Sequence, residues 1–251
     1  MKMLVFDLDG TLLNTQTVID LPEREIISEY TRRGVLISYI TARSPRAVLE
    51  ILKDMPCDGI SYYNGAMTYC DGKLIDSNLI KYQDGINIYN IFKDTDISVY
   101  IEPFSYRQNK IFNLDTREII EGSIYDIPEN DIQRIRIIAE KIDVDIPDYL
   151  SITTTRDNYT LVLNKNATKE KALCGIANYY GVKTQDIIAF GDDLNDTNMI
   201  KEAGIGVAMG NAVDELKSVA DYVIDTNDNN GIFKFLSDNR MMENVGKNKY
   251  P

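Results

Sequence analysis

Short apolar runs alternate with helical patterns at both ends of the chain. Five runs are apolar on successive positions and predict buried strands: 2–6, 35–40, 187–190, 205–208 and 222–224. Between them the apolar residues recur at helical spacing: 20–33, 168–180, 195–203 and 213–220. Strands that are apolar on both faces are typical of a parallel sheet covered by helices, so the pattern predicts an α/β core.

Local signals add detail to the first half of the chain. Ser44 and Pro45 predict a helix that runs to about Lys53, because serine is a favoured cap and proline fits the first helical position. Residues 59–63 predict a further strand, and Asp71-Gly72 predicts the turn of a hairpin.

The pattern changes between about residues 81 and 164. The strands expected there alternate apolar and polar residues: 97–101, 134–139, 151–155 and 159–163. Such strands suit a sheet with one open face. We therefore predict that residues 81–164, called the insert below, form a smaller mixed domain between two core segments, 1–80 and 165–251.

Composition excludes several classes of protein. A formal net charge of −12 argues against nucleic acid or an anionic membrane as the partner, although a small anion could still bind beside local positive charge. No apolar run reaches the roughly 18 residues that a membrane helix needs, and no signal peptide is evident, so we expect a cytoplasmic protein. We expect it to be either a monomer or a homodimer. The chain has no histidine, which excludes imidazole bases and histidine metal sites.

Three predicted strands end in polar residues. Asp7 follows the first strand, Thr41 follows the second, and Asp192 follows the strand at 187–190. Ligands of open parallel sheets bind at the carboxyl ends of the strands. We therefore expect these three side chains to converge, with the Thr41 hydroxyl and the neighbouring backbone N–H groups able to bind oxygen atoms without adding charge.

The sequence Asp7-Leu8-Asp9-Gly10-Thr11 places two carboxylates in a small volume. Their repulsion would raise one pKa unless a cation lay between them, and Mg²⁺ prefers oxygen ligands of this kind. Asp9-Gly10 could instead be only a turn. The second acidic cluster, residues 191–196, favours the metal site, since helix capping needs one such residue and not several.

Lys169 is the cation that could balance these carboxylates. Ala172 and Leu173 lie three and four residues further along the predicted helix, so Lys169 belongs to its apolar stripe. A buried lysine at a helix start is unfavourable against the helix dipole unless anions hold it. The alternative is an ordinary solvated lysine.

Taken in order, these motifs resemble the haloacid dehalogenase superfamily, specifically its Cof-type branch of phosphatases, which carries a large cap within a Rossmann-like, three-layer core. The resemblance rests on four ordered segments: Asp7-Leu8-Asp9-Gly10-Thr11, Thr41-Ala42-Arg43, Thr168-Lys169-Glu170-Lys171, and Gly191-Asp192-Asp193-Leu194-Asn195-Asp196. Asn64-Gly65-Ala66 and residues 206–212 also look like this branch. Ala42 departs from it, since glycine is commoner there.

The resemblance implies a role for each matched residue. Asp7 would attack phosphorus to form an aspartyl-phosphate, and Asp9 would act as acid and then as base. Mg²⁺ would be held by the Asp7 carboxylate, the Asp9 carbonyl and the Asp192 carboxylate, supported by Asp196. The transferring phosphoryl group would be bound by Thr41, Ala42, Lys169 and Asn195.

The expected activity is Mg²⁺-dependent hydrolysis of small phosphorylated metabolites, most simply sugar phosphates, with pyridoxal phosphate or flavin mononucleotide as further candidates. A phosphomutase of the same superfamily and a non-catalytic sensor of phosphorylated metabolites remain alternatives. Tyr106, Arg107 and Arg156 of the insert are candidates for contact with the substrate.

Overall fold

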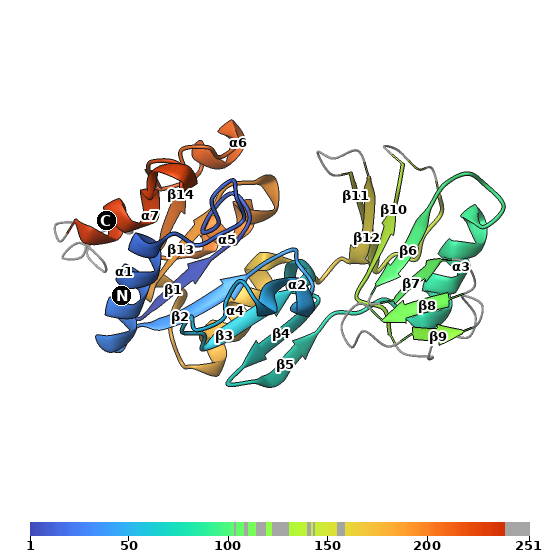
Figure 1. Cartoon of the computed structure of the whole chain (residues 1–251), viewed down its shortest axis with the longest axis horizontal. Coiled ribbons are helices and arrows are strands. Elements are labelled where there is room, and N and C mark those ends of the chain that lie inside the picture. The colour runs from blue at the N-terminus through green and yellow to red at the C-terminus, as the bar shows by residue number, and fades with distance from the viewer. Residues whose placement is uncertain are drawn as a thin grey trace.

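The computed structural model covers the core and much of the insert. The residues it describes are 1–102, 104–107, 110–113, 119–121, 131–139, 142, 144–154 and 159–238, and of 104–107, 110–113 and 119–121 it describes the backbone alone. Two sheets dominate these residues, one at each end of the molecule in Figure 1.

The larger sheet has eight strands in the order β15-β14-β13-β1-β2-β3-β4-β5. Its first six strands are parallel: β15 (Tyr222–Val223), β14 (Ile205–Ala208), β13 (Ile187–Gly191), β1 (Met3–Phe6), β2 (Leu36–Ile40) and β3 (Gly59–Tyr62). An antiparallel hairpin of β4 (Met67–Cys70) and β5 (Lys73–Ser77) completes it. The side chains of β1 and β13 are entirely buried, as strands covered on both faces should be.

Helices pack against this sheet in two groups. One group contains α1 (Leu21–Arg32) and α7 (Gly231–Ser237), and the Tyr30 hydroxyl of α1 donates to the carbonyl of Leu236 in α7. The other contains α4 (Lys169–Tyr179) and α5 (Thr197–Glu202). The connection β1-α1-β2 runs from the centre of the sheet toward one edge, and β13-α5-β14 runs toward the other edge. Because parallel crossovers are right-handed, two connections that run in opposite directions place their helices on opposite faces of the sheet. The predicted three-layer α/β core is confirmed.

The insert contains a second sheet with its own apolar cluster. Its order is β11-β12-β10-β6, formed by Leu150–Thr154, Thr160–Asn164, Arg134–Ile137 and Val99–Glu102. The helix α3 (Tyr82–Phe92) covers one face, where Ile88, Ile101, Ile135 and Val162 pack together. A third sheet joins β7 (Phe104–Arg107), β8 (Lys110–Asn113) and β9 (Ile119–Glu121).

The insert also contacts the core through a small apolar cluster. Leu161 and Leu163 of β12 pack against Tyr63 and Ala66. Tyr63 begins the 3-10 turn η1 (Tyr63–Gly65) that follows β3, and Ala66 comes directly after that turn. The face of the insert sheet opposite α3 is therefore turned toward the end of β3. The domain boundaries at 80/81 and 164/165 stay a prediction.

Two elements differ from the sequence expectations. The helix at Ser44-Pro45 is α2 (Pro45–Leu49), which ends well before Lys53, although the Ser44 hydroxyl caps it by accepting the Ala47 N–H as predicted. The chain continues past Leu49 in turns, in which the Leu52 N–H donates to the Val48 carbonyl, and the left-handed conformation of Asp54, with φ 64°, ends the helical path. The predicted helix 195–203 instead begins with the 3-10 turn η4 (Leu194–Asp196) before α5.

The helix α3 was missed because Gly85 lowers helix propensity in its first half. A Cβ at Gly85 would lie 2.1 Å from Cδ1 of Ile132, the far end of that side chain, so a larger residue would require the Ile132 side chain to shift. The short helix α6 (Asp214–Lys217) lies within the predicted range 213–220.

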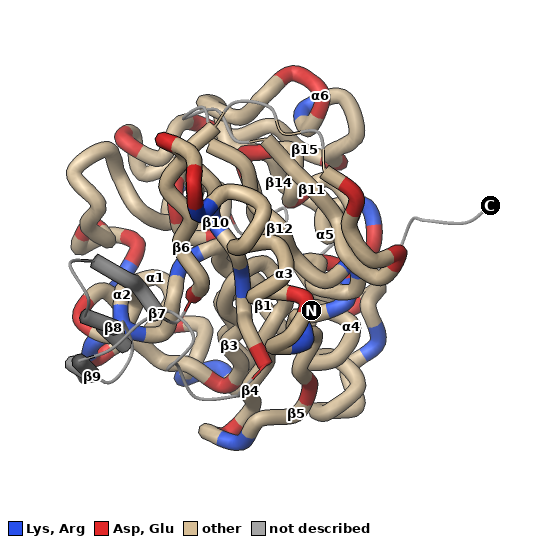
Figure 2. The backbone as a smooth tube through the Cα atoms, turned by 90° about the vertical axis from the view of Figure 1, so that its right-hand side faces the viewer, with Lys and Arg blue, Asp and Glu red and all other residues tan. Residues whose placement is uncertain are grey.

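None of the helices described is long and apolar enough to cross a membrane. Acidic positions are spread over many elements rather than gathered on one (Figure 2).

Candidate active site

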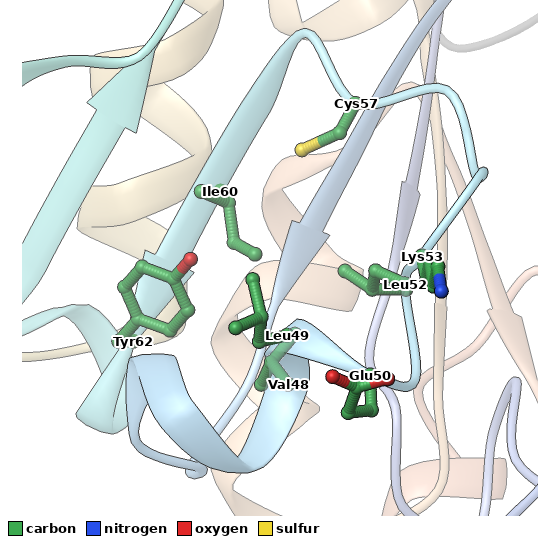
Figure 3. Close-up of a pocket in the computed structure, with 8 residues that line it drawn as sticks. All are labelled: Val48, Leu49, Glu50, Leu52, Lys53, Cys57, Ile60 and Tyr62. Atoms are coloured by element: carbon green, nitrogen blue, oxygen red, sulfur yellow. The ribbon is translucent and has the colours of Figure 1, made fainter. Parts of the chain in front are cut away.

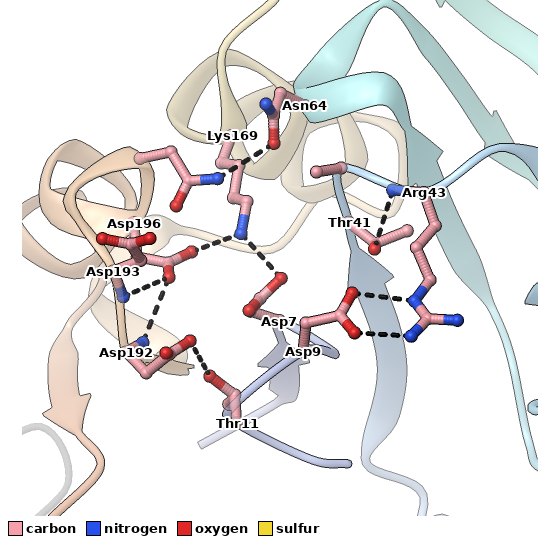
Figure 4. Close-up of polar contacts among 12 residues, drawn as sticks. Asp7, Asp9, Thr11, Thr41, Arg43, Asn64, Lys169, Asp192, Asp193 and Asp196 are labelled. Atoms are coloured by element: carbon pink, nitrogen blue, oxygen red, sulfur yellow. Dashed lines mark hydrogen bonds and ion pairs between the residues drawn. The ribbon is translucent and has the colours of Figure 1, made fainter. Parts of the chain in front are cut away.

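The predicted site lies where β1, β2 and β13 end. These strands are neighbours in the sheet, and the paired residues Phe6 and Phe190, and Phe6 and Tyr39, bring their carboxyl ends level. Asp7 then follows β1, and its N–H still donates to the carbonyl of Phe190. The side chains that follow these strands, Asp7, Thr41 and Asp192, therefore lie at one edge of the sheet, as expected from the strand ends (Figure 4).

Lys169 lies at the centre of the site and is buried. Its ammonium donates to Asp7 Oδ1 at 2.6 Å and to Asp196 Oδ1 at 2.7 Å, and its side chain is only 1% exposed. The helix α4 holds it in place, beginning at the cap Thr168, whose hydroxyl accepts the Lys171 N–H. The expectation of a buried lysine held by anions is confirmed, and the solvated alternative is excluded.

Three carboxylates cluster together at this position, and two of them, those of Asp7 and Asp196, contact the ammonium. Oxygen atoms of Asp7, Asp192 and Asp196 lie within 4.8 Å of one another, and all three residues are buried. Thr11 donates its hydroxyl to Asp192 Oδ1 at 3.0 Å, which orients that side chain. Asp196 Oδ2 accepts the N–H groups of Asp192 and Asp193, both at 3.1 Å, so Asp196 also fixes the loop after β13.

Burial and charge shift the pKa values of these groups. Burial raises the pKa of Asp7 well above its usual value, and Asp196 and Asp192 add to the shift while Lys169 opposes it. Burial and the nearby Asp196 raise the pKa of Asp192 to about 6. Burial alone would lower the pKa of Lys169, but the carboxylates of Asp196 and Asp7 raise it above its ordinary value.

These residues fit a divalent cation. Three buried carboxylates face a single ammonium, so negative charge is in excess, and all the offered ligand atoms are hard oxygens. Gly10 packs closely against Asp192, because a Cβ at position 10 would lie 2.3 Å from Asp192 Oδ2. Asn211 fixes the same loop by donating to the Gly10 carbonyl at 2.7 Å.

Asp9 lies beside this cluster and points toward a different cation. Arg43 binds its carboxylate through two hydrogen bonds, Nε to Oδ2 at 2.8 Å and Nη2 to Oδ1 at 2.6 Å. In Figure 4 the Asp9 carboxylate faces Arg43, whereas the Asp7 carboxylate faces Lys169. The hydrogen bond to Asp9 raises the pKa of the Arg43 guanidinium.

Arg43 belongs to the turn that follows β2, residues Thr41-Ala42-Arg43, called the 41–43 turn below. Thr41 is fully buried, and its hydroxyl accepts the Arg43 N–H at 3.1 Å. The sequence placed Arg43 in the Thr41-Ala42-Arg43 motif but assigned it no separate role. Its pairing with Asp9 was missed because 34 residues separate them and nothing local predicts the contact.

Asn195 is exposed at the rim of the site, in η4. Its Nδ2 donates to Asn64 Oδ1 at 3.1 Å, which joins the loop after β13 to the turn after β3. Asn64 has the left-handed conformation with φ 59°, which asparagine tolerates better than most residues. The Asn64-Gly65 dipeptide was the sequence signal for this position, although it was not assigned to the site.

The structure thus brings together Asp7, Lys169, Asp192 and Asp196, with Thr41, Ala42 and Asn195 at the ends and turns of adjoining strands. The carboxylate of Asp9 pairs with Arg43 and is not one of the three clustered carboxylates; its predicted metal contact is through its backbone carbonyl. Of the candidates in the insert, Tyr106 and Arg107 belong to β7, whose side chains are not described, and Arg156 lies outside the described residues.

A separate surface groove of about 390 Å³ lies between α2 and β3 (Figure 3). Its lining is mostly apolar, including Leu49, Leu52 and Ile60, with Glu50 and Lys53 at the edge. None of the clustered carboxylates lines it, so the groove is not part of the site.

Comparison with known proteins gives consistent matches. A family model described as haloacid dehalogenase-like hydrolase matches residues 4–125 and 103–236. A 5-amino-6-(5-phospho-D-ribitylamino)uracil phosphatase of Bacillus subtilis is 29% identical over 279 residues, which cover 94% of this chain and 97% of that protein. A putative phosphatase of Haemophilus influenzae is also 29% identical, over 94% of this chain and 97% of its own length.

A solved structure has the same arrangement of elements. A phosphatase of the haloacid dehalogenase superfamily from Bacteroides thetaiotaomicron superimposes with a TM-score of 0.76 and 26% identity, covering 94% of each chain. A sugar phosphatase of subclass IIB, at 22% identity and a TM-score of 0.73, covers 94% of this chain and 98% of its own and shares the fold.

Proposed function

This chain belongs to the haloacid dehalogenase-like hydrolase family and is a phosphatase, and we propose that it hydrolyses phosphate monoesters through an aspartyl-phosphate on Asp7 with the help of Mg²⁺. The observation that carries the proposal is the position of the Asp7 carboxylate, buried against the Lys169 ammonium and beside the carboxylates of Asp192 and Asp196. The second carboxylate that the chemistry needs, on Asp9, lies two residues further along the same loop.

The reaction has two steps. An Asp7 oxygen attacks phosphorus and the bond to the leaving oxygen breaks. Asp9, protonated on one oxygen and bound to Arg43 through the other, gives its proton to the leaving oxygen. Asp9 then takes a proton from water, which attacks phosphorus, releases inorganic phosphate and restores the Asp7 carboxylate. Lys169 favours the ionised form of Asp7 and orients it, because its ammonium lies 2.6 Å from that carboxylate and is also bound to Asp196.

The carboxylates of Asp7 and Asp192 and the carbonyl of Asp9 would hold Mg²⁺, and Asp196 would support them through Lys169 and the loop N–H groups that it binds. The cation supplies positive charge that neutralises the transferring phosphoryl group. We assign binding of the phosphoryl oxygens to the Thr41 hydroxyl, the N–H groups near Ala42, Lys169 and Asn195.

We propose small phosphorylated metabolites, foremost phosphates of sugars and sugar alcohols, as the substrates, with residues 81–164 acting as the cap over the site. Support comes from the relative named for a phosphoribityl substrate, since a ribityl chain is a sugar alcohol. Pyridoxal phosphate and flavin mononucleotide are further members of the class to be tested.

A phosphate-release screen tests the proposal. The protein is incubated with sugar phosphates, 5-amino-6-(5-phospho-D-ribitylamino)uracil, pyridoxal phosphate and flavin mononucleotide, with Mg²⁺ or with chelator. Release should need Mg²⁺ and should be lost in Asp7→Asn, which should remain folded. Release by Asp7→Asn at the parent rate would exclude the covalent mechanism, and phosphate transfer without release would indicate a mutase.

A further inference from the structure

The 41–43 turn is held by hydrogen bonds to each of its three carbonyls. The carbonyl of Thr41 accepts the Asn64 N–H at 2.9 Å, and the carbonyl of residue 43 accepts the Tyr63 N–H at 3.1 Å. Both donors are backbone groups of the core. The middle carbonyl, that of residue 42, accepts instead from Nη1 of Arg134 at 2.9 Å, a side chain of the insert 92 residues further along the chain.

The guanidinium of Arg134 is itself fixed. Nη2 and Nε donate to Glu102 Oε2 at 2.7 and 3.2 Å, and Glu102 is only 3% exposed. The two residues are cross-strand partners on β10 and β6. The guanidinium also lies over the ring of Tyr63, 5.1 Å from its centroid. An arginine held on three sides can bind a carbonyl with little further loss of side-chain freedom.

Arg43 continues the connection from this turn to the reaction. Its guanidinium makes the two hydrogen bonds to the Asp9 carboxylate, and its N–H is bound to the Thr41 hydroxyl within the turn. A continuous set of contacts therefore runs from the insert through the 41–43 turn to Asp9. Removing Arg134 would free one of the three carbonyls that fix the turn.

We propose that Arg134 is a positioning residue for phosphoryl transfer. It fixes the 41–43 turn, and through Arg43 of that turn it fixes the carboxylate of Asp9. In this way the insert is coupled to the group that acts as acid and base in the reaction. The inference rests on the proposed function, because it assumes that Asp9 protonates the leaving oxygen. Arg134 touches the turn and is not itself in contact with the reacting atoms.

The loss of activity on replacing Arg134 should depend on the leaving group of the substrate. Proton donation matters most when the leaving oxygen is a poor leaving group and little when it departs easily as an anion. A misplaced Asp9 should therefore slow the poor leaving groups selectively, whereas damage to substrate binding should slow all substrates alike.

A series of substituted phenyl phosphates of similar size measures this directly. For Arg134→Gln, a plot of log kcat/KM against the pKa of the phenol should be steeper than for the parent. We expect a loss of about tenfold or more for the least acidic phenol and about twofold for p-nitrophenol, within the range that acid catalysis contributes. Arg134→Lys, which cannot bind Glu102 and the turn carbonyl with the same fork, should show the same change if Arg134→Gln does not fold.

Arg136→Gln is the matched control. Arg136 lies on the same strand and face, and its Nε is 3.8 Å from Glu102 Oε1, but none of its described contacts reaches the 41–43 turn. Its plot should run parallel to that of the parent. In an Arg43→Gln background, adding Arg134→Gln should steepen the plot no further, since the connection is already broken.

Parallel plots for Arg134→Gln and the parent, or equal steepening by Arg136→Gln, would overturn the inference. That failure differs from failure of the proposed function, because in the first case Asp7→Asn would still be inactive. Thermal unfolding of each variant establishes that the compared proteins are folded.

Discussion

Replacing Lys169 by methionine should destabilise the protein strongly when no metal is present. The substitution keeps most of the side-chain length but removes the ammonium, which lies 2.6 Å from Asp7 and 2.7 Å from Asp196. The carboxylates of Asp7, Asp192 and Asp196 would then be left buried together without a protein cation.

The size of the loss follows from these contacts. Each hydrogen bond to a charged group contributes about 1.5–3 kcal/mol, and removing one partner of a buried ion pair costs about 3–5 kcal/mol. Protonation of one carboxyl would offset part of this. We expect the free energy of unfolding at pH 7.5 to fall by about 3 kcal/mol, a large part of the 5–15 kcal/mol typical of a folded protein.

The loss of stability caused by Lys169→Met should become smaller as the pH falls. Burial already raises the pKa of Asp7 in the folded protein, and without the opposing Lys169 ammonium that pKa would lie still further above its unfolded value. The folded state would then bind more protons between those two pKa values, so its stability would rise as the pH falls through the folded pKa. The deficit of Lys169→Met should therefore be smaller at pH 5 than at pH 7.5.

Urea denaturation followed by circular dichroism, in chelator and in Mg²⁺, measures both effects. Lys171→Met is the control, since Lys171 lies on the same helical turn but is exposed, and it should change stability by less than about 0.5 kcal/mol. Mg²⁺ should stabilise Lys169→Met more than the parent, because the uncompensated carboxylates attract the cation more strongly. A loss below about 1 kcal/mol, or one that does not change with pH, would refute the reasoning.

Further predictions concern the loops around the carboxylates. Gly10→Ala should lower kcat/KM by at least about tenfold, because its Cβ would lie 2.3 Å from Asp192 Oδ2, a misplacement near the reacting groups. Gly72→Ala, at a similar φ of 71° but with no atom within 4 Å, should cost about 1 kcal/mol of stability and leave kcat/KM unchanged, and equal kinetic losses would refute the steric argument. Thr11→Val removes the hydrogen bond that orients Asp192 and should weaken Mg²⁺ binding by about tenfold in titration calorimetry, whereas an unchanged affinity would contradict that role. Because the pKa of Asp192 is raised to about 6, the affinity for Mg²⁺ should fall as the pH drops below that value, and equal affinities at pH 5 and pH 7.5 would exclude Asp192 as a ligand.

Much of the core could be predicted from the sequence because its signals are local. The apolar strands β1, β2, β13 and β14 stand between helices that begin or end at recognisable residues, such as the Thr168 cap and Gly34, whose φ is 82°. Parallel strands bring their carboxyl ends to one edge, so the meeting of Asp7 with Asp192 also followed from the pattern. The burial of Lys169 followed from helical spacing alone.

Contacts between elements distant in the chain needed the tertiary structure. The helix α2 ends at Leu49 and the left-handed Asp54 follows it. The helix α3 forms despite Gly85 because its apolar residues, such as Ile88, pack against Ile101 of the insert sheet. Nothing in the sequence near Asp9 indicates Arg43, and nothing near Ala42 indicates Arg134, since those partners lie 34 and 92 residues away. The sequence by itself determined which side chains stand at the strand ends, because strand and helix periods are local; how the loops and the insert hold those side chains was decided by packing between distant segments.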